Sequence, residues 1–473
     1  AVPSRAPYGV QHTARWLIEA GGCETGPAVP KPGDHNTVYA NCKGRFGVYD
    51  KRTGQERRYY VGAANMYGHN PRDLRYRFQR VSPIHVSPHD PGTVYHASQF
   101  VHRTRDEGET WETISPDLTA FEADKQVISG SPITRDITGE EFYSTIYSLR
   151  ESPVQAGVIW VGANDGPVHV TRDGGESWSD VTPRGLPSGG RVDAVEPSPH
   201  DAAVAYVAVL RYQLGDDRPY IYRTQNFGKS WKLLSDGRNG IPADYPVRVV
   251  REDPVRRGLL FAGTEYGLFV SFDDGGQWQS FQQNLPVTPV TDIRIHRGDL
   301  VISTMGRAFW VLDSVATLRE AALPEPGEKP LLFSPAETIR YRQSYGNTDS
   351  NAVPQYPKPS AIIDYYLPES GGDVTLEVIA TDGSVVNAFR SGEDDVDTAT
   401  EVVQDMALSE TRYIESVSLN AAEGINRFHW DMRHRGAWDE DEKKRFRNGP
   451  LVKPGEYTLR LTVEGNTLEQ SLL

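Results

Sequence analysis

An eight-residue pattern that occurs four times constrains this chain more than any other feature of its sequence. The pattern has a hydroxyl residue first, Asp or Asn third, Gly fifth and Trp eighth. Each copy stands between two short apolar stretches, so each is expected to form the tip of a β-hairpin. The four copies are TRDEGETW at 104–111, TRDGGESW at 171–178, TQNFGKSW at 224–231 and SFDDGGQW at 271–278.

The chemistry of this pattern is that of a stable turn. The Asp or Asn side chain can accept hydrogen bonds from N–H groups of the turn, and the Gly supplies a positive φ that a Cβ would oppose. The Trp then returns to the sheet and buries a large ring, so we expect all four Trp side chains to be buried in equivalent places. These residues are predicted to be structural rather than catalytic: Asp106, Trp111, Asp173, Trp178, Asn226, Trp231, Asp273 and Trp278.

The spacing of the copies predicts the architecture. Successive copies begin 67, 53 and 47 residues apart, which suits one four-stranded blade of a β-propeller for each copy. A second repeat, a Ser-Pro or Asp-Pro turn, precedes an apolar strand at Ser87, Ser152, Ser198 and Asp253. Two histidines, His89 and His200, recur within this turn and are expected to be turn residues rather than metal ligands.

Composition excludes several classes of protein. The chain has 473 residues with 10% aromatics, 44 Gly and 33 Pro, which is typical of turn-rich all-β proteins. The formal net charge of −14 argues against nucleic acid as a partner, because phosphate binding needs a basic surface. No apolar run is long enough to span a bilayer, and residues 1–16 do not read as a signal peptide. No metal-binding spacing occurs among the 12 histidines, so neither a metal nor a cofactor is expected.

The two cysteines, Cys23 and Cys42, flank a turn at residues 31–36. An antiparallel hairpin centred on that turn would place them opposite each other, which favours a disulfide in an exported protein. Two unpaired thiols are the alternative.

Domain boundaries follow from changes in pattern along the chain. Six strand-rich units occupy residues 1–316, a Pro-rich stretch at 317–358 is predicted to be a linker, and alternating strands return at 359–473. The final segment, KPGEYTLRL at 453–461, looks like the last hairpin of an Ig-like β-sandwich. The expected fold is therefore all-β, an Asp-box β-propeller followed by an Ig-like β-sandwich.

The repeats and the strands around them closely resemble one family, the sortilin-like BNR-repeat (Asp-box) propellers of large secreted bacterial proteins, which are often labelled glycosyl hydrolases. The resemblance covers about residues 15–320. It implies a propeller, export to an extracellular, cell-surface or periplasmic location, and a place in the C-terminal part of a longer product. The stretches that carry it include NTVYANCKGRFGVYD at 36–50, GVIWVGANDGPVHVTRDGGESW at 157–178, GLLFAGTEYGLFVSFDDGGQW at 258–278 and STMGRAFWVLD at 303–313.

Six units suggest an incomplete ring. We expect a seven-bladed propeller that is completed by an upstream propeller segment of the same precursor or by a partner chain, with six-bladed closure as the alternative. A propeller closes because its first and last blades pair and leave no open sheet edge.

Three functions are compatible with these features. The first is binding of a protein, peptide or glycan, because charged residues that open the innermost strands would line the central tunnel; inter-blade ion pairs are the alternative role for these residues. The ligand-binding candidates are Arg80, Arg191, Asp193, Arg248 and Asp292. Another of the three is a purely structural role as a surface component, which fits the lack of a recognisable catalytic signature.

The second function is hydrolysis of an extracellular polysaccharide in a cleft between two propellers, which needs two carboxylates across the glycosidic bond. The catalytic candidates are Asp136, Glu140, Glu141 and Asp165. Trp160, Tyr143 and Tyr212 could stack on sugar rings, although packing in the core is the expected role for each. The R-I-P motif of sialidases is absent from the sequence, which disfavours sialidase chemistry, and enzymatic activity of another kind stays an open alternative.

Overall fold

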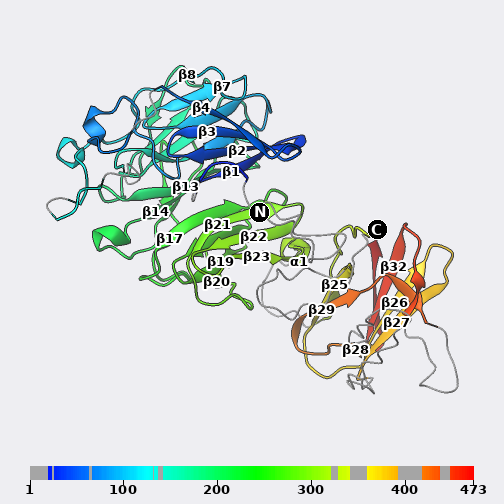
Figure 1. Cartoon of the computed structure of the whole chain (residues 1–473). Coiled ribbons are helices and arrows are strands. Elements are labelled where there is room, and N and C mark those ends of the chain that lie inside the picture. Colours follow the sequence, from blue (N-terminus) through cyan, green and yellow to red (C-terminus); the bar gives the residue numbers. More distant parts are fainter. Residues whose placement is uncertain are drawn as a thin grey trace. The chain divides into compact units, whose positions relative to one another are not determined.

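The structure is a computed structural model that describes residues 20–23, 26–62, 66–130, 133–136, 142–320, 329–340, 359–392, 418–436 and 448–473. The chain forms two compact units (Figure 1). Of the described residues, the first holds 20–296 and 301–311, and the second holds 297–300 and those from 312 onward. No helix in the described part of the chain is long and apolar enough to cross a membrane.

In its described residues the first unit has six antiparallel sheets, which follow one another in chain order. Each of the first five has four strands, and the outermost strand is only two residues long in four of them. The sheets are β1 (Ala28–Lys31), β2 (Asp34–Cys42), β3 (Arg45–Asp50) and β4 (Gln55–Tyr60); β5 (Ile84–Val86), β6 (Val94–Ala97), β7 (Val101–Thr104) and β8 (Glu112–Thr113); β9 (Ile146–Glu151), β10 (Ile159–Ala163), β11 (Val168–Thr171) and β12 (Ser179–Asp180); β13 (Arg191–Pro197), β14 (Ala205–Leu210), β15 (Ile221–Thr224) and β16 (Lys232–Leu233); β17 (Val247–Glu252), β18 (Leu260–Thr264), β19 (Gly267–Ser271) and β20 (Gln279–Ser280); and β21 (Val290–His296), β22 (Asp299–Thr304) and β23 (Phe309–Leu312).

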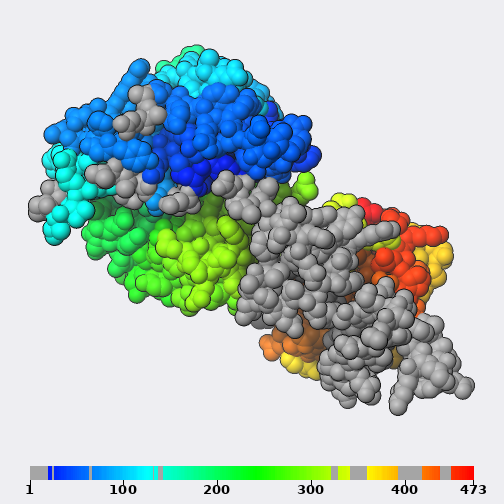
Figure 2. Space-filling model, in the orientation of Figure 1, coloured from blue at the N-terminus to red at the C-terminus, as the bar shows by residue number. Residues whose placement is uncertain are grey.

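Each sheet packs face to face on the next, and the first strands β1, β5, β9, β13, β17 and β21 contact one another in that order. Second strands such as β10 and β18 are buried throughout because apolar layers cover both faces. Between the third and fourth sheets, for example, Val158, Trp160, Val195 and Val207 form one buried cluster. In the space-filling view, neighbouring parts of the sequence stay together on the surface (Figure 2). This is a propeller-like fold, as the repeats predict. The seventh blade from another segment stays a prediction.

The four repeats form hairpin tips between the third and fourth strands of the second to fifth sheets. At the first tip, Thr104 Oγ1 accepts the N–H of Gly108 at 2.8 Å and donates to Asp106 Oδ1 at 2.8 Å. Asp106 Oδ1 in turn accepts the N–H of Thr110 at 2.8 Å. Equivalent bonds form around Asp173, Asn226 and Asp273. The tips are therefore closed locally by their own side chains.

The tryptophans link each sheet to the one before it. The Nε1–H groups of Trp178, Trp231 and Trp278 donate to the backbone carbonyls that end the preceding sheets, at 2.9, 2.6 and 2.9 Å. Those carbonyls belong to Ile114, Val181 and Leu234.

Full burial of all four tryptophans is wrong. Trp278 is buried, whereas Trp111, Trp178 and Trp231 are half-buried. All four stand at the outer end of their sheets, and each is followed by an exposed two-residue strand. Trp278 differs because the loop after β16 reaches it, where the Asn239 carbonyl accepts the N–H of Trp278 at 2.7 Å.

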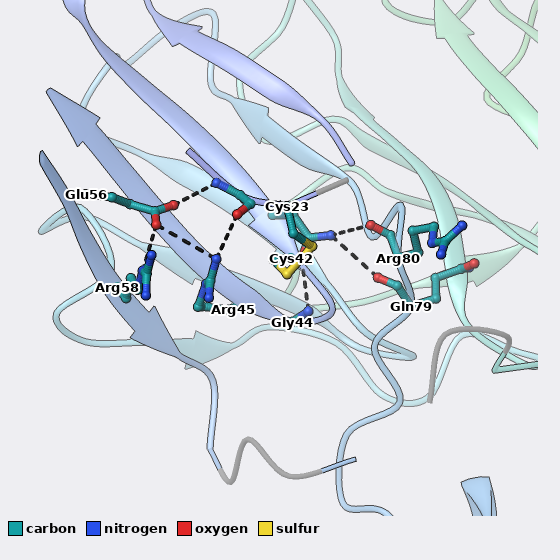
Figure 3. The surroundings of a disulfide bond; sticks show 10 residues. Cys23, Cys42, Gly44, Arg45, Glu56, Arg58, Gln79 and Arg80 are labelled. Atoms are coloured by element: carbon teal, nitrogen blue, oxygen red, sulfur yellow. Dashed lines mark hydrogen bonds and ion pairs between the residues drawn. A yellow bond between two sulfur atoms is a disulfide. The ribbon is translucent and has the colours of Figure 1, made fainter. Parts of the chain in front are cut away.

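A disulfide joins Cys23 to Cys42, with the Cα atoms 5.2 Å apart. Cys42 ends β2 and Cys23 lies before β1, so the bond fastens the entering chain to the first sheet. Figure 3 shows the polar contacts around it. The N–H of Gly22 donates to Glu56 at 2.7 Å, and Arg45 donates to the Gly22 carbonyl at 2.8 Å.

The second unit is a two-sheet β-sandwich around one apolar core that includes Ile363, Leu376, Trp430 and Leu461. One sheet has the order β24-β25-β29, the other β28-β27-β26-β32-β33, and β30 pairs with β31. The strands are β24 (Leu331–Leu332), β25 (Ala361–Leu367), β26 (Val374–Ala380), β27 (Val385–Ser391), β28 (Ser418–Leu419), β29 (Gly424–Trp430), β30 (Arg433–Arg435), β31 (Asn448–Leu451), β32 (Tyr457–Val463) and β33 (Asn466–Leu472). Whether its topology is that of an Ig domain stays a prediction.

The stretch at 317–358, expected to be a linker, contains structure that belongs to this unit. Helix α1 (Ala316–Glu320) lies there, and Thr317 donates to the buried Asp364 of β25. Strand β24 adds to the edge of β25 through Leu331 and Leu332. Its pairing partners, Tyr366 and Tyr365, lie 35 and 33 residues later in the sequence, which local pattern does not reveal. Among the residues that the structure describes, three short 3₁₀ helices also occur: Pro71–Asp73, Ala123–Lys125 and Tyr212–Leu214.

Candidate functional site

Three successive first strands carry a β-bulge at the same place. Tyr147 on β9, Asp193 on β13 and Arg248 on β17 are each skipped in the pairing with the second strand. A bulge inserts one unpaired residue and redirects its side chain. All three residues lie five positions before the Ser-Pro or Asp-Pro turn of their sheet. The repeat therefore presents one redirected side chain from each of three neighbouring sheets.

The bulged residues join into a chain of ion pairs. Arg191, at the start of β13, pairs with Asp193 through both oxygens, and its guanidinium carbon lies 4.5 Å from the Tyr147 ring centroid. Asp193 Oδ2 lies 3.8 Å from Arg248 Nη1, and Arg248 Nε donates to Glu265 at 2.5 Å. Burial raises the pKa of Asp193, and the hydrogen bond from Arg191 opposes that effect.

A cavity of about 430 Å³ opens beside this chain of ion pairs. It is built by four segments from three sheets: the loop after β14, the residue before β17, the tight turn between β18 and β19, and the residues before β21. Its lining residues are Tyr212, Asp217, Pro246, Glu265, Tyr266, Val287, Thr288 and Pro289. We call it the tyrosine cavity.

The tyrosine cavity combines exposed aromatic faces with carboxylates. Tyr212 and Tyr266 are both exposed, and Tyr266 rests against Tyr245 with ring centroids 4.6 Å apart. Glu265 is held by Arg248, while Asp217 is exposed and forms no hydrogen bond or ion pair with the residues that the structure describes. No Lys, Arg or His belongs to the described lining. The cavity is therefore acidic at its mouth.

A second cavity, of about 190 Å³, lies at the start of β13. Tyr147 and Arg191 line it together with Gln79, Tyr143 and Asn164. The ion-pair chain thus runs from this smaller cavity to the tyrosine cavity.

The five ligand-binding candidates divide into three groups. Arg191, Asp193 and Arg248 come together as described. Asp292 lies on β21 and accepts Arg251 at 2.6 Å, so it belongs to a different cluster of charges. Arg80 precedes β5, and its carbonyl accepts Asn41 Nδ2 at 2.8 Å. Tyr147, Glu265 and Tyr266 were missed, although the position five residues before the turn could have identified Tyr147.

Two of the four catalytic candidates, Asp136 and Asp165, lie within the described residues. Asp165 is buried, and its Oδ2 accepts the N–H groups of Ala120 and Phe121 at 3.0 and 3.3 Å. Burial raises the pKa of Asp165, but its side chain is closed off from any substrate. Asp136 is half-buried in a loop, and its backbone N–H donates to the carbonyl of Ser129 at 2.9 Å. Glu140 and Glu141 lie outside the described residues.

The aromatic residues considered for sugar stacking also differ from one another. Trp160 is fully buried in the core, as expected. Tyr143 lines the smaller cavity, with Lys125 Nζ 5.4 Å from its ring centroid. Tyr212 is the one of the three that lines the tyrosine cavity. Within the described ranges, no three His, Cys, Asp or Glu side chains gather in a way that could hold a metal ion.

Comparisons with known proteins give the fold a context. No family model and no curated protein matches this chain. Among solved structures it is similar to the GH74 xyloglucanase from Xanthomonas campestris (15% identity, TM-score 0.44, 71% of this chain and 50% of that one). It is also similar to a GH74 enzyme from Niastella koreensis (13%, 0.41, 72% and 50%) and to YCF48 from Cyanidioschyzon merolae (11%, 0.38, 61% and 94%). The chain spans about half the length of the two GH74 enzymes.

Proposed function

We propose that this chain is an exported binding protein whose tyrosine cavity receives a basic segment of a peptide or protein. The observation that carries the proposal is the pairing of two exposed tyrosines with the unpaired Asp217 in one cavity. An ammonium or guanidinium group is attracted both to aromatic faces and to carboxylates.

Two further features support this choice. The ion-pair chain from Arg191 to Arg248 fixes Glu265 in place, so the carboxylate needs little ordering when a ligand binds. The formal net charge of −14 attracts cationic partners over longer distances. The disulfide between Cys23 and Cys42 supports an exported location, since disulfides persist in oxidising compartments.

A peptide array followed by calorimetry tests the proposal. Peptides with a central Arg or Lys should bind, and the same sequences with Gln in that place should not. Tyr266→Ala and Asp217→Asn should each weaken binding about 10-fold, as expected for the loss of an aromatic or charged contact. Tyr60→Ala is the matched control, because Tyr60 is as exposed as Tyr266, at 46%, but lies on β4. Equal binding of Arg and Gln peptides would contradict the proposal.

Glycoside hydrolysis is the second candidate function, because Asp217 and Glu265 place two carboxylates in the same cavity. Both classes of glycosidase that use paired carboxylates need this minimum. A panel of extracellular polysaccharides, assayed for new reducing ends with the chain and with Glu265→Gln, separates the two functions. Turnover that Glu265→Gln abolishes would favour the enzyme, and its absence across the panel would favour binding.

A further inference from the structure

A second set of equivalent residues lies deeper along the first strands. His85 on β5, Arg150 on β9, Glu196 on β13 and Arg251 on β17 each stand two residues before the Ser-Pro or Asp-Pro turn. The tip residues of the repeat are nearly identical from sheet to sheet, but these four differ in charge. Their backbone position is repeated, so the differences lie in chemistry alone.

Arg251 is fully engaged at this level. Its Nη2 donates to Asp292 at 2.6 Å, its Nη1 lies 3.3 Å from Glu196, and its Nε donates to the carbonyl of Ile293 at 3.0 Å. Asp292 also lies 3.8 Å from Arg294 Nε on β21. Two carboxylates are thus shared between two arginines.

Arg150 is the third arginine of the cluster, and it has no such partner. Among the described residues it forms no hydrogen bond and no ion pair. Burial and the nearby charges of Arg294 and Arg251 lower the pKa of Arg150 to about 9. Three guanidinium groups therefore face two carboxylates, which leaves an excess of positive charge.

The cluster is open to a small ligand on the β21 side. The side chains of Arg294 and Asp292 are 55% and 44% exposed, while Arg251 is buried. Arg294 also influences His85 of the second sheet, since burial and then the charges of Arg150 and Arg294 hold the pKa of His85 well below its ordinary value. His85 and Arg150 stand at equivalent positions of the contacting strands β5 and β9, and β9 also contacts β13, which carries Glu196 of this cluster.

We infer that Arg150 and Arg294 form a binding site for a small oxyanion, either phosphate or a carboxylate. A guanidinium group presents a planar fork of N–H donors that matches these anions. The bound anion would balance the excess positive charge, and Arg251 would hold the surrounding carboxylates in place. The site is separate from the tyrosine cavity, whose described lining carries carboxylates and no cation.

Calorimetric titration of the full chain at constant ionic strength tests the inference. Inorganic phosphate is the probe in one arm and glutarate in the other, both in chloride buffer. We expect saturable binding with one site in at least one arm, and the tighter arm identifies the chemistry of the ligand. Arg150→Gln should weaken that binding at least about 10-fold, because a charge-assisted hydrogen bond is lost. Arg150→Lys should fall between the two, because it keeps the charge but loses the fork.

Arg184→Gln is the matched control, because Arg184 is an exposed arginine that lies outside the cluster. It should bind as the wild type does. The melting temperature of Arg150→Gln in phosphate-free buffer should not fall below that of the wild type, since the change removes repulsion between like charges. Failure of both anions to bind saturably, or equal affinity in the wild type and Arg150→Gln, would overturn the inference. If Arg150→Gln does not fold, the same comparison with Arg150→Lys decides.

Discussion

The hairpin tips of the propeller sheets repeat the same side chains, whereas the first strands of these sheets vary in their side chains. At the tips, four sheets use nearly the same residues and the same hydrogen bonds, around Asp106, Asp173, Asn226 and Asp273. Along the first strands the backbone repeats, but the side chains change from sheet to sheet, with Tyr, Asp and Arg at the bulge. The tips share the same residues because these residues close each turn, so their role is in folding.

Variation along the first strands points to function. Arg191, Asp193, Arg248 and Glu265 link neighbouring sheets and end at the tyrosine cavity. A purely structural role would be served equally well by apolar residues, since replacing buried ion pairs with packed hydrophobic groups is often neutral or stabilising. The comparison predicts that changes at the tips alter stability and leave binding unchanged, whereas changes in the tyrosine cavity alter binding. The charged pairs on the first strands are expected to contribute to stability as well.

The largest expected effect is at a tip tryptophan. Trp278→Ala should reduce the free energy of unfolding by about 3–5 kcal/mol, because it removes a buried ring. Trp111→Ala should cost about 1 kcal/mol less, since Trp111 is half-buried and its buried Nε1 forms no hydrogen bond with the described residues. Urea unfolding of both variants measures the difference. An equal or larger loss for Trp111→Ala would contradict this ranking of the tips.

The next effect is at a first strand. Arg251→Met should destabilise the protein by about 3 kcal/mol, because Glu196 and Asp292 would lose the buried cation that they share. The double variant Arg251→Met with Asp292→Asn should recover part of that loss. Thermal unfolding of the two proteins tests the coupling, and strictly additive losses would show that the pair is not energetically linked.

A smaller effect is expected from one tip hydroxyl. Thr104→Val keeps the shape of a buried side chain but removes the acceptor for the N–H of Gly108. The free energy of unfolding should fall by about 1–3 kcal/mol, as for a buried donor left without a partner. Thr224→Val, at the tip that carries Asn226, serves as the comparison and should give a similar loss. No loss in either variant would show that the tips do not depend on these bonds.

The smallest effect concerns pH. Hydrogen bonds from the side chain and N–H of Thr110 lower the pKa of Asp106 to about 2 from an ordinary value of 3.8. A carboxyl whose pKa is lowered by folding stabilises the protein above pH 3.8, and this contribution is lost as the pH falls towards 2. The melting temperature of Asp106→Asn should therefore change less between pH 4 and pH 2 than that of the wild type. Identical pH profiles would contradict the role of the ionised tip.

The sequence revealed the tips and most propeller strands because their signals are local. The Thr, Asp, Gly and Trp of each repeat contact one another within eight residues, and the Ser-Pro turns mark where first strands end. The tyrosine cavity could not be predicted in this way, because Tyr212, Glu265 and Val287 come from three sheets and meet only after packing. Asp193 and Arg248 were identified because they are charged residues near strand starts. Tyr147 was missed because it is uncharged.

The distinction between local and long-range signals also explains two differences between the expected and the observed structure. Strand β24 lies in the stretch expected to be a linker, because its partner β25 is distant in sequence. The buried Asp165 shows the opposite error, since a carboxylate beside an aromatic residue looked catalytic but instead accepts backbone N–H groups.

The affinity of one Arg-containing peptide for Tyr266→Ala and Thr104→Val, measured by calorimetry beside the unfolding midpoint of each, tests the central claim most directly. Tyr266→Ala should lose about 10-fold in affinity with little change in its midpoint, because the ring is exposed on the cavity wall. Thr104→Val should show a lower midpoint and unchanged affinity. The opposite result, with binding lost at the tip and kept at the cavity, would contradict the separation of folding from recognition.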